Sequence, residues 1–401
     1  MKCVILAAGE GKRMHPLTYT RPKVMLPIAG KPILEWNLMN AARAGLKDFL
    51  FIIGYKGEMV REYFQDGKPW NVKISYINQG KPMGTAHAVG MVESFADDFV
   101  VLCGDTIFSP VDIKNIMKKG LQLGVTTTDT PSQYGVIDLD GETVRTVHEK
   151  EPDPQSNVIN AGIYHFDKSI FTMIKKTGMS PRGELEITDS INMLTQASPI
   201  HAVLLKEWRD VVYPWHLLDA NEELLQRQEA CCYGTVDHRA SLSGTVLVGK
   251  ETRILPGACI EGPVYIGSNC KIGPNCYIRP FTSIGDHCHI GNACEIKNSI
   301  IMDHSNVPHQ SYVGDSVIGH HCNLGAGTEI ANLRLDKKNV IVTLNGKKLD
   351  SNRRKLGAII GDNVQTGINS TINIGSIIGN NVVLGPGSIT KGELRPDTRI
   401  W

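Results

Sequence analysis

An aliphatic side chain recurs every six residues through the C-terminal part of this 401-residue chain. The spacing begins at Leu242, continues without a miss to Met302, and resumes at residues 318–330 and 360–390. A period of six fits neither the 3.6-residue turn of an α-helix nor the two-residue alternation of a strand. It is typical of a parallel β-helix, in which each flat face takes one hexapeptide and stacked coils bury the aliphatic row.

Small residues support this interior. Five cysteines occupy one position of the repeat, four residues after the aliphatic one, where Cys acts as a small buried hydrophobe. No C-x-x-C pair occurs among the ten cysteines, so we expect neither a metal site nor disulfides from them. Three faces to a coil predict six to seven coils at about 4.8 Å each. The five cysteines are Cys270, Cys276, Cys288, Cys294 and Cys322.

Two segments interrupt the repeat. Residues 303–317 include the run Asp-His-Ser-Asn-Val-Pro-His-Gln-Ser-Tyr, and residues 333–356 are polar and become basic toward their end. Insertions leave a solenoid as loops, and such loops often carry function. We therefore expect binding or catalytic residues in these segments.

The N-terminal part of the chain alternates strand and helix patterns, which favours an α/β fold with a mostly parallel sheet. The composition changes near residues 229–235. We expect one domain over residues 1–229, a linker over 230–235 and the β-helix over 236–401. Strands are expected at 4–6, 49–53, 72–77 and 99–102, and helices at 32–45, 58–64, 85–95 and 111–119.

Charge and hydropathy limit the function classes. The net charge of +1 shows no footprint for nucleic acid or for an anionic membrane. No window approaches the roughly 18 apolar residues of a membrane span. The apolar run at residues 3–8 is too short for a secretory signal. We therefore expect a cytoplasmic protein that binds small molecules.

A glycine-rich segment directly follows the first predicted strand. Residues 6–18 read Leu-Ala-Ala-Gly-Glu-Gly-Lys-Arg-Met-His-Pro-Leu-Thr. Gly9 and Gly11 allow backbone N–H groups to approach a phosphate, and Lys12 and Arg13 add positive charge. The third glycine of a Rossmann fingerprint is missing, and no G-K-[ST] of a Walker A loop follows. The segment therefore predicts a phosphate-binding loop of another kind at the edge of a Rossmann-like sheet.

The whole segment resembles the signature of sugar-1-phosphate nucleotidylyltransferases, G-x-G-x-R-x-x-P-L-T followed by P-K. Further matches follow in the family's order as far as residue 210. The resemblance implies that Arg13 holds the leaving pyrophosphate and that Lys23 reaches the α-phosphate. It implies nucleotide binding by Leu6, Ala8, Gly9, Gly11, Gln79, Gly84 and Thr85.

The same resemblance implies a magnesium site and a sugar-phosphate site. Asp105 and Asp210 match the family's metal-binding acids, and carboxylates suit Mg²⁺. The family usually has a small turn after the second acid, where this chain has Val-Val-Tyr-Pro-Trp at 211–215. UTP or dTTP is the expected cosubstrate, because a pocket discriminates one methyl group weakly. The sugar phosphate would contact Gly135, Glu149, Lys150 and Asn160.

The segment at residues 307–315 resembles the catalytic loop of a second enzyme type. This is the bifunctional N-acetylglucosamine-1-phosphate uridylyltransferase/glucosamine-1-phosphate acetyltransferase family, here in its archaeal form. The resemblance implies a left-handed β-helix, a homotrimer and acetyl-CoA as cosubstrate, with His309 as the base, since the pKa of histidine suits that role. Sugar phosphate would be bound by Arg279, Lys297, Tyr312 and Asn332, and acetyl-CoA by Asn323 and Ala326.

Three functions stay open at this level. The first is a bifunctional enzyme that acetylates glucosamine 1-phosphate and then makes UDP-N-acetylglucosamine. The second is a monofunctional glucose-1-phosphate thymidylyl- or uridylyltransferase whose β-helix serves trimer assembly, and the third is a non-catalytic nucleotide-sugar sensor. The group around His309 favours the first. The basic run at 353–355 either binds the phosphates of coenzyme A or packs on a neighbour.

Overall fold

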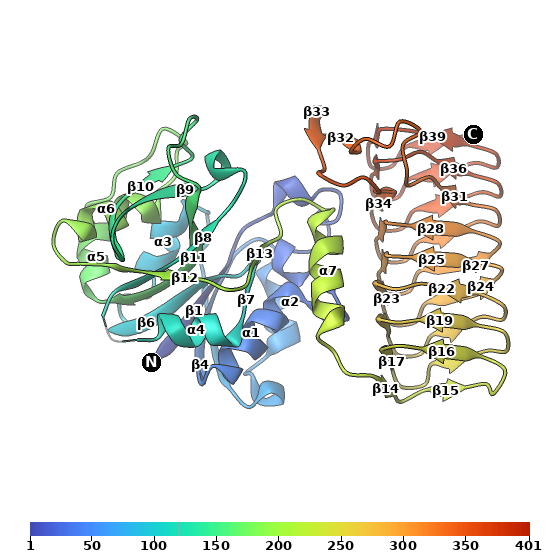
Figure 1. Cartoon of the computed structure of the whole chain (residues 1–401), viewed down its shortest axis with the longest axis horizontal. Helices are drawn as coiled ribbons and strands as arrows, with labels where there is room; N and C mark the ends of the chain where they lie inside the picture. The colour runs from blue at the N-terminus through green and yellow to red at the C-terminus, as the bar shows by residue number, and fades with distance from the viewer. Residues whose placement is uncertain (119) are drawn as a thin grey trace. The chain divides into compact units, whose positions relative to one another are not determined.

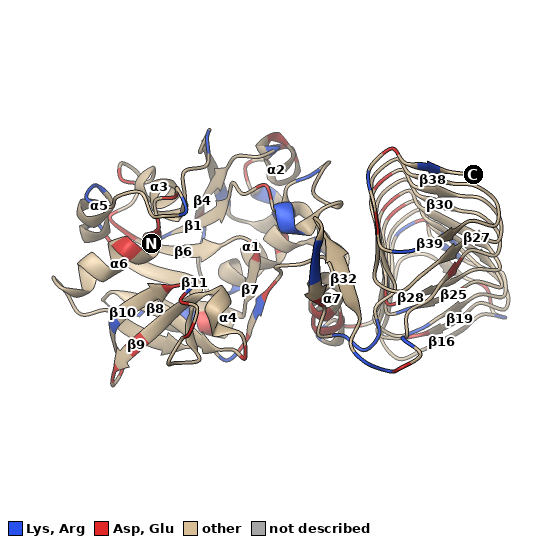
Figure 2. Ribbon diagram, turned by 90° about the horizontal axis from the view of Figure 1, so that it is seen from above, with Lys and Arg blue, Asp and Glu red and all other residues tan. Residues whose placement is uncertain are grey.

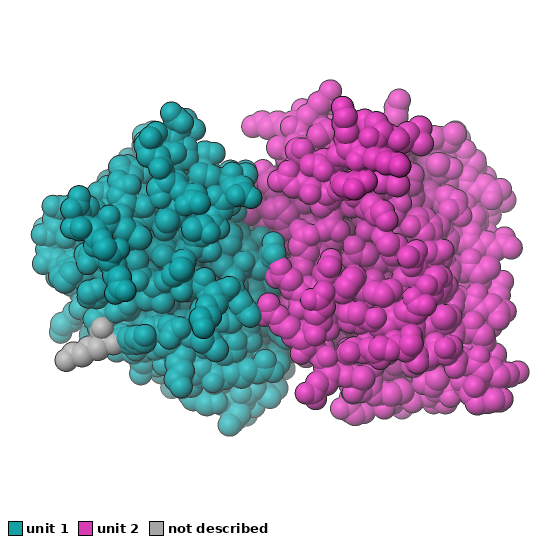
Figure 3. Space-filling model, viewed as in Figure 1, with its two compact units in different colours: residues 1–10, 22–25, 33–210 teal, residues 11–21, 26–32, 211–401 magenta. Residues whose placement is uncertain are grey.

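The structure is a computed structural model that describes residues 1–118 and 120–401. Its contacts divide the chain into two compact units, coloured separately in Figure 3. Unit 1 comprises Met1–Glu10, Pro22–Met25 and Ile33–Asp210. Unit 2 comprises Gly11–Arg21, Leu26–Pro32 and Val211–Trp401. The division into domains at residues 229–236 stays a prediction.

Unit 1 is built on a nine-stranded sheet with the order β5-β4-β1-β6-β11-β8-β12-β10-β9. Its first four strands are parallel, as the alternating pattern predicts, and β11 runs antiparallel to β6. A separate antiparallel pair joins β7 (Thr106–Phe108) to β13 (Trp208–Asp210). The sheet strands are β5 (Lys73–Asn78), β4 (Asp48–Ile53), β1 (Lys2–Ala7), β6 (Asp98–Cys103), β11 (Val158–Asp167), β8 (Gln122–Thr127), β12 (His201–Leu204), β10 (Thr143–Glu149) and β9 (Gly135–Asp140).

Helices cover both faces of this sheet (Figure 1). In β1, Cys3 and Ile5 join the apolar cluster of α1, α2 and α4, while Val4 joins the cluster of α3, α5 and α6. This alternation buries the strand on both sides, as expected of a parallel sheet between helices. The helices are α1 (Ile33–Arg43), α2 (Gly57–Phe64), α3 (Thr85–Gly90), α4 (Pro110–Ile116), α5 (Ser169–Ile174) and α6 (Ile187–Thr195).

The Rossmann-like α/β fold of this part is therefore confirmed, with two differences in helix length. The helix expected at 85–95 ends at Gly90. The helix expected at 111–119 ends at Ile116, and its predicted last residue, Lys119, lies outside the described residues.

Unit 2 contains three parallel sheets that form the faces of a β-helix (Figure 1). The first face has β14 (Cys231–Cys232), β17 (Val246–Val248), β20 (Val264–Ile266), β23 (Thr282–Ile284), β26 (Ile300–Ile301), β29 (Val317–Ile318), β34 (Ala358–Ile360), β37 (Ser376–Ile378) and β40 (Glu393–Leu394). The second has β15 (Thr235–Val236), β18 (Arg253–Ile254), β21 (Lys271–Ile272), β24 (His289–Asn292), β27 (Asn306–His309), β30 (Asn323–Leu324), β35 (Gln365–Thr366), β38 (Val383–Leu384) and β41 (Arg399–Ile400). The third has β16 (Ser241–Ser243), β19 (Cys259–Glu261), β22 (Tyr277–Ile278), β25 (Glu295–Lys297), β28 (Tyr312–Gly314), β31 (Glu329–Ile330), β36 (Thr371–Ile372) and β39 (Ile389–Thr390).

The aliphatic residues of the repeat fill the interior of this β-helix. Ile254, Ile272 and Ile290 stack in register on the second face and are buried. The predicted row of cysteines is buried in the same core, with no disulfide among them. The six-residue period therefore marks the residues that point inward on each face.

The predicted interruption at 303–317 is wrong. Ile301, not Met302, takes the inward position, because it pairs with Ile284 and Ile318 on neighbouring coils. The segment stays in the coil as β27 and β28, with Val307 and Val313 buried in the core. A corner shortened by one residue before Ile301 shifts the repeat and hides it from a strict count of six.

The prediction of six to seven coils is also wrong. In the described part of the chain two faces have nine strands and the third has eight. The count missed the shifted strands β27 and β28 and the terminal strands, whose inward residues lie outside the unbroken run. Only the second predicted interruption, at 333–356, leaves the coil.

This excursion starts and ends beside the bridge between Leu333 and Lys355. It contains a hairpin of β32 (Ile341–Leu344) and β33 (Lys347–Asp350). Unit 2 also holds helix α7 (His216–Gln226). The N-terminal segment 11–21 belongs to this unit too, where Arg21 Nη2 lies 2.6 Å from Asp362 Oδ2 of the β-helix.

No helix of the described chain is long and apolar enough to cross a membrane. Basic and acidic residues are interspersed along the ribbon in the view of Figure 2. This distribution agrees with the balanced charge of the sequence.

Replacing an inward residue should destabilise the β-helix strongly. Ile290→Ala removes a fully buried side chain and should lower the free energy of unfolding by about 2–5 kcal/mol. The matched control is Ile389→Ala, whose side chain is 79% exposed and whose loss should change stability by less than about 0.5 kcal/mol. Denaturant unfolding of both variants measures the difference, and equal losses would contradict the inward register.

Candidate active sites

The predicted nucleotide site begins where the parallel strands of unit 1 end. The carbonyl of Leu6 accepts a hydrogen bond from Gly104 N–H at 2.9 Å, and that of Ala8 accepts one from Tyr55 N–H at 3.1 Å. A Cβ atom on Gly104 would lie 2.5 Å from the Leu6 carbonyl oxygen, so glycine is needed there. The carboxyl ends of β1, β4 and β6 therefore meet at one edge, the usual ligand-binding edge of such sheets.

Lys23 and the two predicted metal-binding acids lie together at this edge. Lys23 Nζ is 2.6 Å from Asp105 Oδ2, with the lysine side chain 9% exposed and the aspartate 40% exposed. Asp210 lies opposite Thr106 in the pair of β13 and β7. Burial raises the pKa of the Cys103 thiol, and the charges of Asp105 and Asp210 raise it further while Lys23 opposes them. All three charged groups thus act on one buried thiol.

These residues fit a magnesium ion in their chemistry. Two carboxylates from adjoining strands supply the hard oxygen ligands that Mg²⁺ prefers. Among the described residues no group of three or more His, Cys, Asp or Glu side chains is placed to hold a metal by itself. A bound Mg²⁺ would therefore take its remaining ligands from water and from substrate phosphates.

The predicted base-binding residues surround a tight loop. Gln79 follows β5, and its Nε2 donates to the Gly84 carbonyl at 3.2 Å and lies 3.1 Å from His87 Nδ1. Gly84 has a φ of 107°, and a Cβ there would lie 2.4 Å from the Leu185 carbonyl oxygen. The Thr85 hydroxyl accepts from Ile187 N–H at 3.1 Å. The loop is thus held to the segment before α6.

The predicted sugar-binding residues lie on β10, β9 and β11. Glu149 Oε1 is 3.1 Å from Arg182 Nη2 and 3.9 Å from Lys150 Nζ. A Cβ on Gly135 would lie 3.2 Å from the other carboxylate oxygen of Glu149, so the two positions adjoin. Arg182 lies among the further matches to the family, but the motif alone assigned it no role.

Asn160 lies near this group. Its Nδ2 donates to the Tyr164 hydroxyl at 2.8 Å, and its Oδ1 accepts from Gly162 N–H at 3.0 Å. Burial raises the pKa of Tyr164 well above its usual value, Cys103 and Glu149 add to the rise, and the bond from Asn160 opposes it. Asn160 is therefore held in place by Tyr164 and Gly162.

Two predicted residues of the phosphate loop belong to unit 2. Gly11 adopts a left-handed conformation with a φ of 72°, and its carbonyl accepts from the Thr18 hydroxyl at 2.9 Å. The Arg13 guanidinium lies 6.0 Å from the ring centre of Tyr213, which stacks on Trp215 at 4.9 Å. The segment 211–215, which departs from the family's small turn, thus supports Arg13. Gly9, in unit 1, is exposed.

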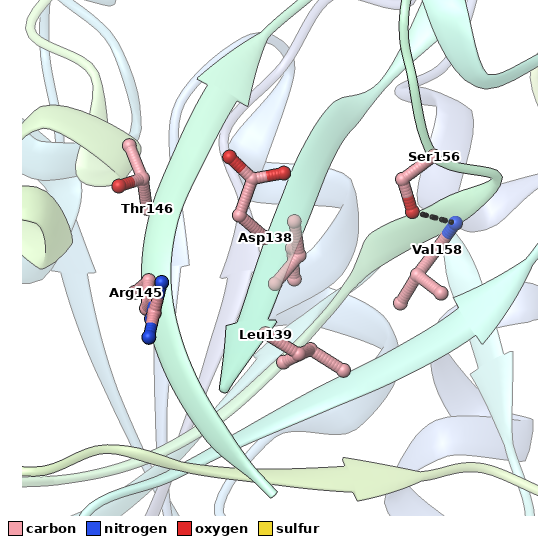
Figure 4. A pocket seen from close by; sticks show the side chains of 7 residues that line it. Asp138, Leu139, Arg145, Thr146, Ser156 and Val158 are labelled. Atoms are coloured by element: carbon pink, nitrogen blue, oxygen red, sulfur yellow. Dashed lines mark hydrogen bonds between the residues drawn. The ribbon is translucent and has the colours of Figure 1, made fainter. Parts of the chain in front are cut away.

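A hollow of about 550 Å³ lies in unit 1 (Figure 4). Residues of β9, β10 and the start of β11 line it, and no predicted site residue is among them. Asp138, Arg145 and Ser156 supply its polar groups. It is therefore formed by the strands that carry Gly135, Glu149 and Asn160, without including those residues.

The predicted acetyl-transfer residues gather on the third face of the β-helix. Arg279 follows β22, and its Nη1 lies 2.9 Å from Glu295 Oε1 on the next coil. Lys297 ends β25 and lies 2.9 Å from Asp315 Oδ2. Tyr312, in β28, stacks in register on Glu295. The coil spacing therefore brings together side chains that are far apart in sequence.

Tyr312 is joined to this group by hydrogen bonding and by charge. Asn332 Nδ2 donates to the Tyr312 hydroxyl at 3.0 Å. Burial raises the pKa of Tyr312, Asp315 and Glu295 add to the rise, and Asn332 and Arg279 oppose it. All four predicted sugar-phosphate residues thus belong to one cluster. Asp315 ends the segment at 307–315 that resembles the catalytic loop, but the motif assigned it no role, because its pairing with Lys297 across the coils is visible only in the structure.

His309 lies at the corner where the chain passes from the second face to the third. It ends β27, it is exposed, and the next residue, Gln310, has a φ of 43°. Asn323, in β30, lies in the row of Asn306 on the second face. Ala326 is beside Gly327, whose N–H donates to the His309 carbonyl at 3.4 Å. The corner of His309 is therefore one coil away from Asn323 and Ala326, and it directly precedes β28, which contains Tyr312.

One residue of the basic run at 353–355 forms an ion pair within unit 2. Arg353 forms an ion pair with Asp219 of α7, and its side chain is mostly buried. This contact favours packing, rather than coenzyme A binding, as the role of Arg353. Arg354 and Lys355 are exposed.

Comparisons with known proteins agree with both halves of the chain. The family model described as nucleotidyl transferase matches residues 2–227, and the one described as GMPPB C-terminal domain matches residues 260–393. A "Bifunctional protein GlmU" of Methanococcus maripaludis is 39% identical over all of this chain and 97% of its own length.

Two further proteins extend the comparison. A "Bifunctional sugar-1-phosphate nucleotidylyltransferase/acetyltransferase" of Sulfurisphaera tokodaii is 40% identical over 98% of each chain. A solved structure, a putative glucose-1-phosphate thymidylyltransferase from Bacillus anthracis, has a TM-score of 0.52 and 30% identity. It covers 58% of this chain and 97% of its own.

A methyl group at Gly84 should impair nucleotide use. Gly84→Ala forces a clash with the Leu185 backbone at a positive φ, so we expect the nucleotide KM to rise at least about tenfold. Gly80→Ala is the control, because Gly80 also has a positive φ but has open space around its Cβ position. Steady-state kinetics of pyrophosphate release measure both, and equal effects would contradict the role of the Gly84 contact.

Proposed function

The chain belongs to the family of bifunctional sugar-1-phosphate nucleotidylyltransferases/acetyltransferases, and from that premise we propose that it converts glucosamine 1-phosphate into UDP-N-acetylglucosamine. The observation that carries the proposal is the cluster of Arg279, Lys297, Tyr312 and Asn332 near the corner that presents His309. A β-helix that served only assembly would not need this cluster. The monofunctional alternative is therefore less well supported.

In the nucleotidyl transfer, an oxygen of the sugar phosphate attacks the α-phosphorus of UTP and pyrophosphate leaves. Negative charge gathers on five-coordinate phosphorus, so positioning and charge neutralisation do most of the work. Lys23 would neutralise the α-phosphate, and Arg13 would hold the pyrophosphate. Glu149 would accept hydrogen bonds from sugar hydroxyls, with Lys150 near the phosphate. dTTP stays an alternative cosubstrate, because uracil and thymine differ by one methyl group.

Asp105 and Asp210 would hold Mg²⁺ in this reaction. The ion, when bound, supplies positive charge against the triphosphate. Asp105 also pairs with the Lys23 ammonium at 2.6 Å, so the carboxylate that would hold the ion also positions this lysine.

In the acetyl transfer, the sugar amine attacks the thioester carbonyl of acetyl-CoA. A C–N bond forms, the C–S bond breaks, and coenzyme A leaves as a thiolate, which then takes up a proton to give the thiol. His309 would accept the proton that the amine loses. Arg279 and Lys297 would contact the phosphate, and Tyr312 and Asn332 the sugar ring.

The acceptor carries both a phosphate and an amine. Arg279 and Lys297 each pair with a carboxylate, so the cluster presents both signs of charge rather than a purely basic surface. This balance suits an acceptor of mixed charge. Asn323 and the backbone at Ala326 would contact acetyl-CoA on the opposite side of His309.

The remaining parts of the proposal follow from the resemblance. We propose that the β-helix winds in the left-handed sense of hexapeptide acyltransferases, that the chain forms a homotrimer and that it acts in the cytoplasm. Small molecules, and neither nucleic acid nor membrane, are its proposed partners. Acetylation would precede uridylylation, because the uridylyl acceptor is the acetylated sugar.

The two activities should respond to different substitutions. His309→Ala removes the base and should slow thiol release by about 100-fold or more while pyrophosphate release from N-acetylglucosamine 1-phosphate stays unchanged. Asp105→Asn should do the reverse, slowing pyrophosphate release by about 100-fold, because it removes one of two anionic ligands. Separate assays of thiol and pyrophosphate measure the two effects.

The unaltered enzyme, supplied with glucosamine 1-phosphate, acetyl-CoA, UTP and Mg²⁺, is the reference. Pyrophosphate release without thiol release, even when each substrate is saturating, would overturn the bifunctional proposal. A loss of both activities in folded His309→Ala would overturn the assignment of separate sites.

A further inference from the structure

A buried carboxylate underlies the acetyl-transfer cluster. Asp315 follows β28 at a coil corner with a φ of 51°, a conformation that Asp and Asn adopt more readily than most residues. Its side chain is 2% exposed. A buried charge is costly unless it is paired and hydrogen-bonded, so the partners of Asp315 decide whether this corner is stable.

Four hydrogen bonds satisfy the two oxygens of this carboxylate. Lys297 Nζ donates to both, at 3.2 Å to Oδ1 and 2.9 Å to Oδ2. Asn298 Nδ2 donates to Oδ1 at 2.9 Å, and Asn332 Nδ2 donates to Oδ2 at 2.6 Å. Asn332 also donates to Tyr312, so one carboxylate is linked to three of the four residues assigned to the sugar phosphate. The fourth, Arg279, is held separately by Glu295.

The backbone of Asp315 also contacts the neck of the excursion at 333–356, by which we mean residues 332 and 356–357, where the chain leaves and rejoins the coil. Its carbonyl accepts from Gly357 N–H at 2.8 Å, where the chain returns to the coil. The carbonyl of Asn332, where the chain leaves the coil, accepts from Leu356 N–H at 3.0 Å. A Cβ on Gly357 would lie 2.2 Å from the carbonyl oxygen of Gly314, so the two strands of the neck meet the corner closely. Asp315 therefore joins the neck and the binding cluster.

We propose that Asp315 is a positioning residue of acetyl transfer, a role that rests on the acetyltransferase activity proposed above. Its carboxylate fixes the Lys297 ammonium and the Asn332 amide, and through Asn332 the Tyr312 hydroxyl, in the arrangement that receives the amino-sugar phosphate. It also balances the charge of Lys297, so that this lysine acts as an oriented donor. Asp315 itself touches no substrate.

The substitution Asp315→Asn tests this role, because it removes the charge and leaves the size of the side chain almost unchanged. Asparagine tolerates the corner conformation, but it has one acceptor oxygen and presents an NH₂ group to donors that need an acceptor. We expect the KM for glucosamine 1-phosphate to rise by about tenfold to a hundredfold, because charge-assisted hydrogen bonds are lost. The KM for acetyl-CoA and the rate of pyrophosphate release from N-acetylglucosamine 1-phosphate should stay within about twofold, since neither uses this contact.

Asp397→Asn is the matched control. Asp397 is an exposed corner residue with a φ of 62°, and it accepts a bond from Asn381 at 2.9 Å on the last coils. This variant makes the same chemical change at the same kind of corner, away from the cluster. It should match the unaltered enzyme in both reactions.

If Asp315→Asn is unstable, a double-mutant cycle with Lys297→Met still tests whether Asp315 acts through Lys297. Lys297→Met alone, and combined with Asp315→Asn, leaves no unpaired lysine at the corner. If Asp315 acts through Lys297, the combined loss of kcat/KM is smaller than the product of the two single losses. Losses that multiply would overturn the proposal.

The outcomes separate this role from the activity on which it rests. No thiol release by the unaltered enzyme would overturn the acetyltransferase and the role of Asp315 together. Thiol release by the unaltered enzyme, with Asp315→Asn equal to Asp397→Asn in the KM for glucosamine 1-phosphate, would overturn only the role of Asp315. A rise in both the acetyl-CoA KM and the sugar-phosphate KM would show general distortion and would also contradict it.

Discussion

The stacking of inward aliphatic side chains fixes the geometry of the β-helix. Ile278 lies under Ile296, and Ile284 lies under Ile301, so each coil is held in register by the one below it. Burial of apolar surface drives this stacking, and each coil contacts only its neighbours. Because the inward residues are in register, the outward residues beside them are also in register from coil to coil. Glu295 and Tyr312 adjoin because their inward neighbours, Ile296 and Val313, are stacked.

Two residues of the acetyl-transfer group lie at corners of the β-helix rather than on its flat faces. The faces repeat, so they offer rows of similar positions, whereas a corner changes the direction of the chain and can present one unique side chain. His309 and Asp315 both lie at such corners, on either side of β28. The first is exposed, and the second is buried and holds the side chains of Lys297 and Asn332. In unit 1 three different elements bring charged side chains together: Asp105 follows β6, Asp210 ends β13 and Lys23 lies in a short 3-10 helix.

Much of the fold could be predicted from the chain because its patterns are local. The six-residue period indicated the β-helix, and buried strands followed by helices indicated the parallel sheet. The period failed between Ile296 and Ile301, because a corner one residue shorter shifts the register without changing the coil. A strict six-residue count therefore wrongly identified the segment that contains β27 and β28 as an interruption of the repeat.

The site residues were predicted by motif, and their partners were not. The motifs assigned substrate contacts to residues such as Glu149 and Lys297, but they assigned no role to the residues that pair with them. Arg182 and Asp315 are paired with these residues by tertiary structure alone. Tyr213 is a further case, since a segment that departs from the family's turn supports Arg13 through its ring.

If one chain carries out both reactions in sequence, glucosamine 1-phosphate, UTP, Mg²⁺ and acetyl-CoA suffice for it to make the acetylated nucleotide sugar. The mass of the nucleotide sugar formed from acetyl-CoA labelled with ¹³C at both acetyl carbons measures this. We expect UDP-N-acetylglucosamine that carries both heavy carbons. Formation of unacetylated UDP-glucosamine would contradict this expectation. So would a failure to form any nucleotide sugar from glucosamine 1-phosphate by an enzyme that still uridylylates N-acetylglucosamine 1-phosphate in a separate reaction.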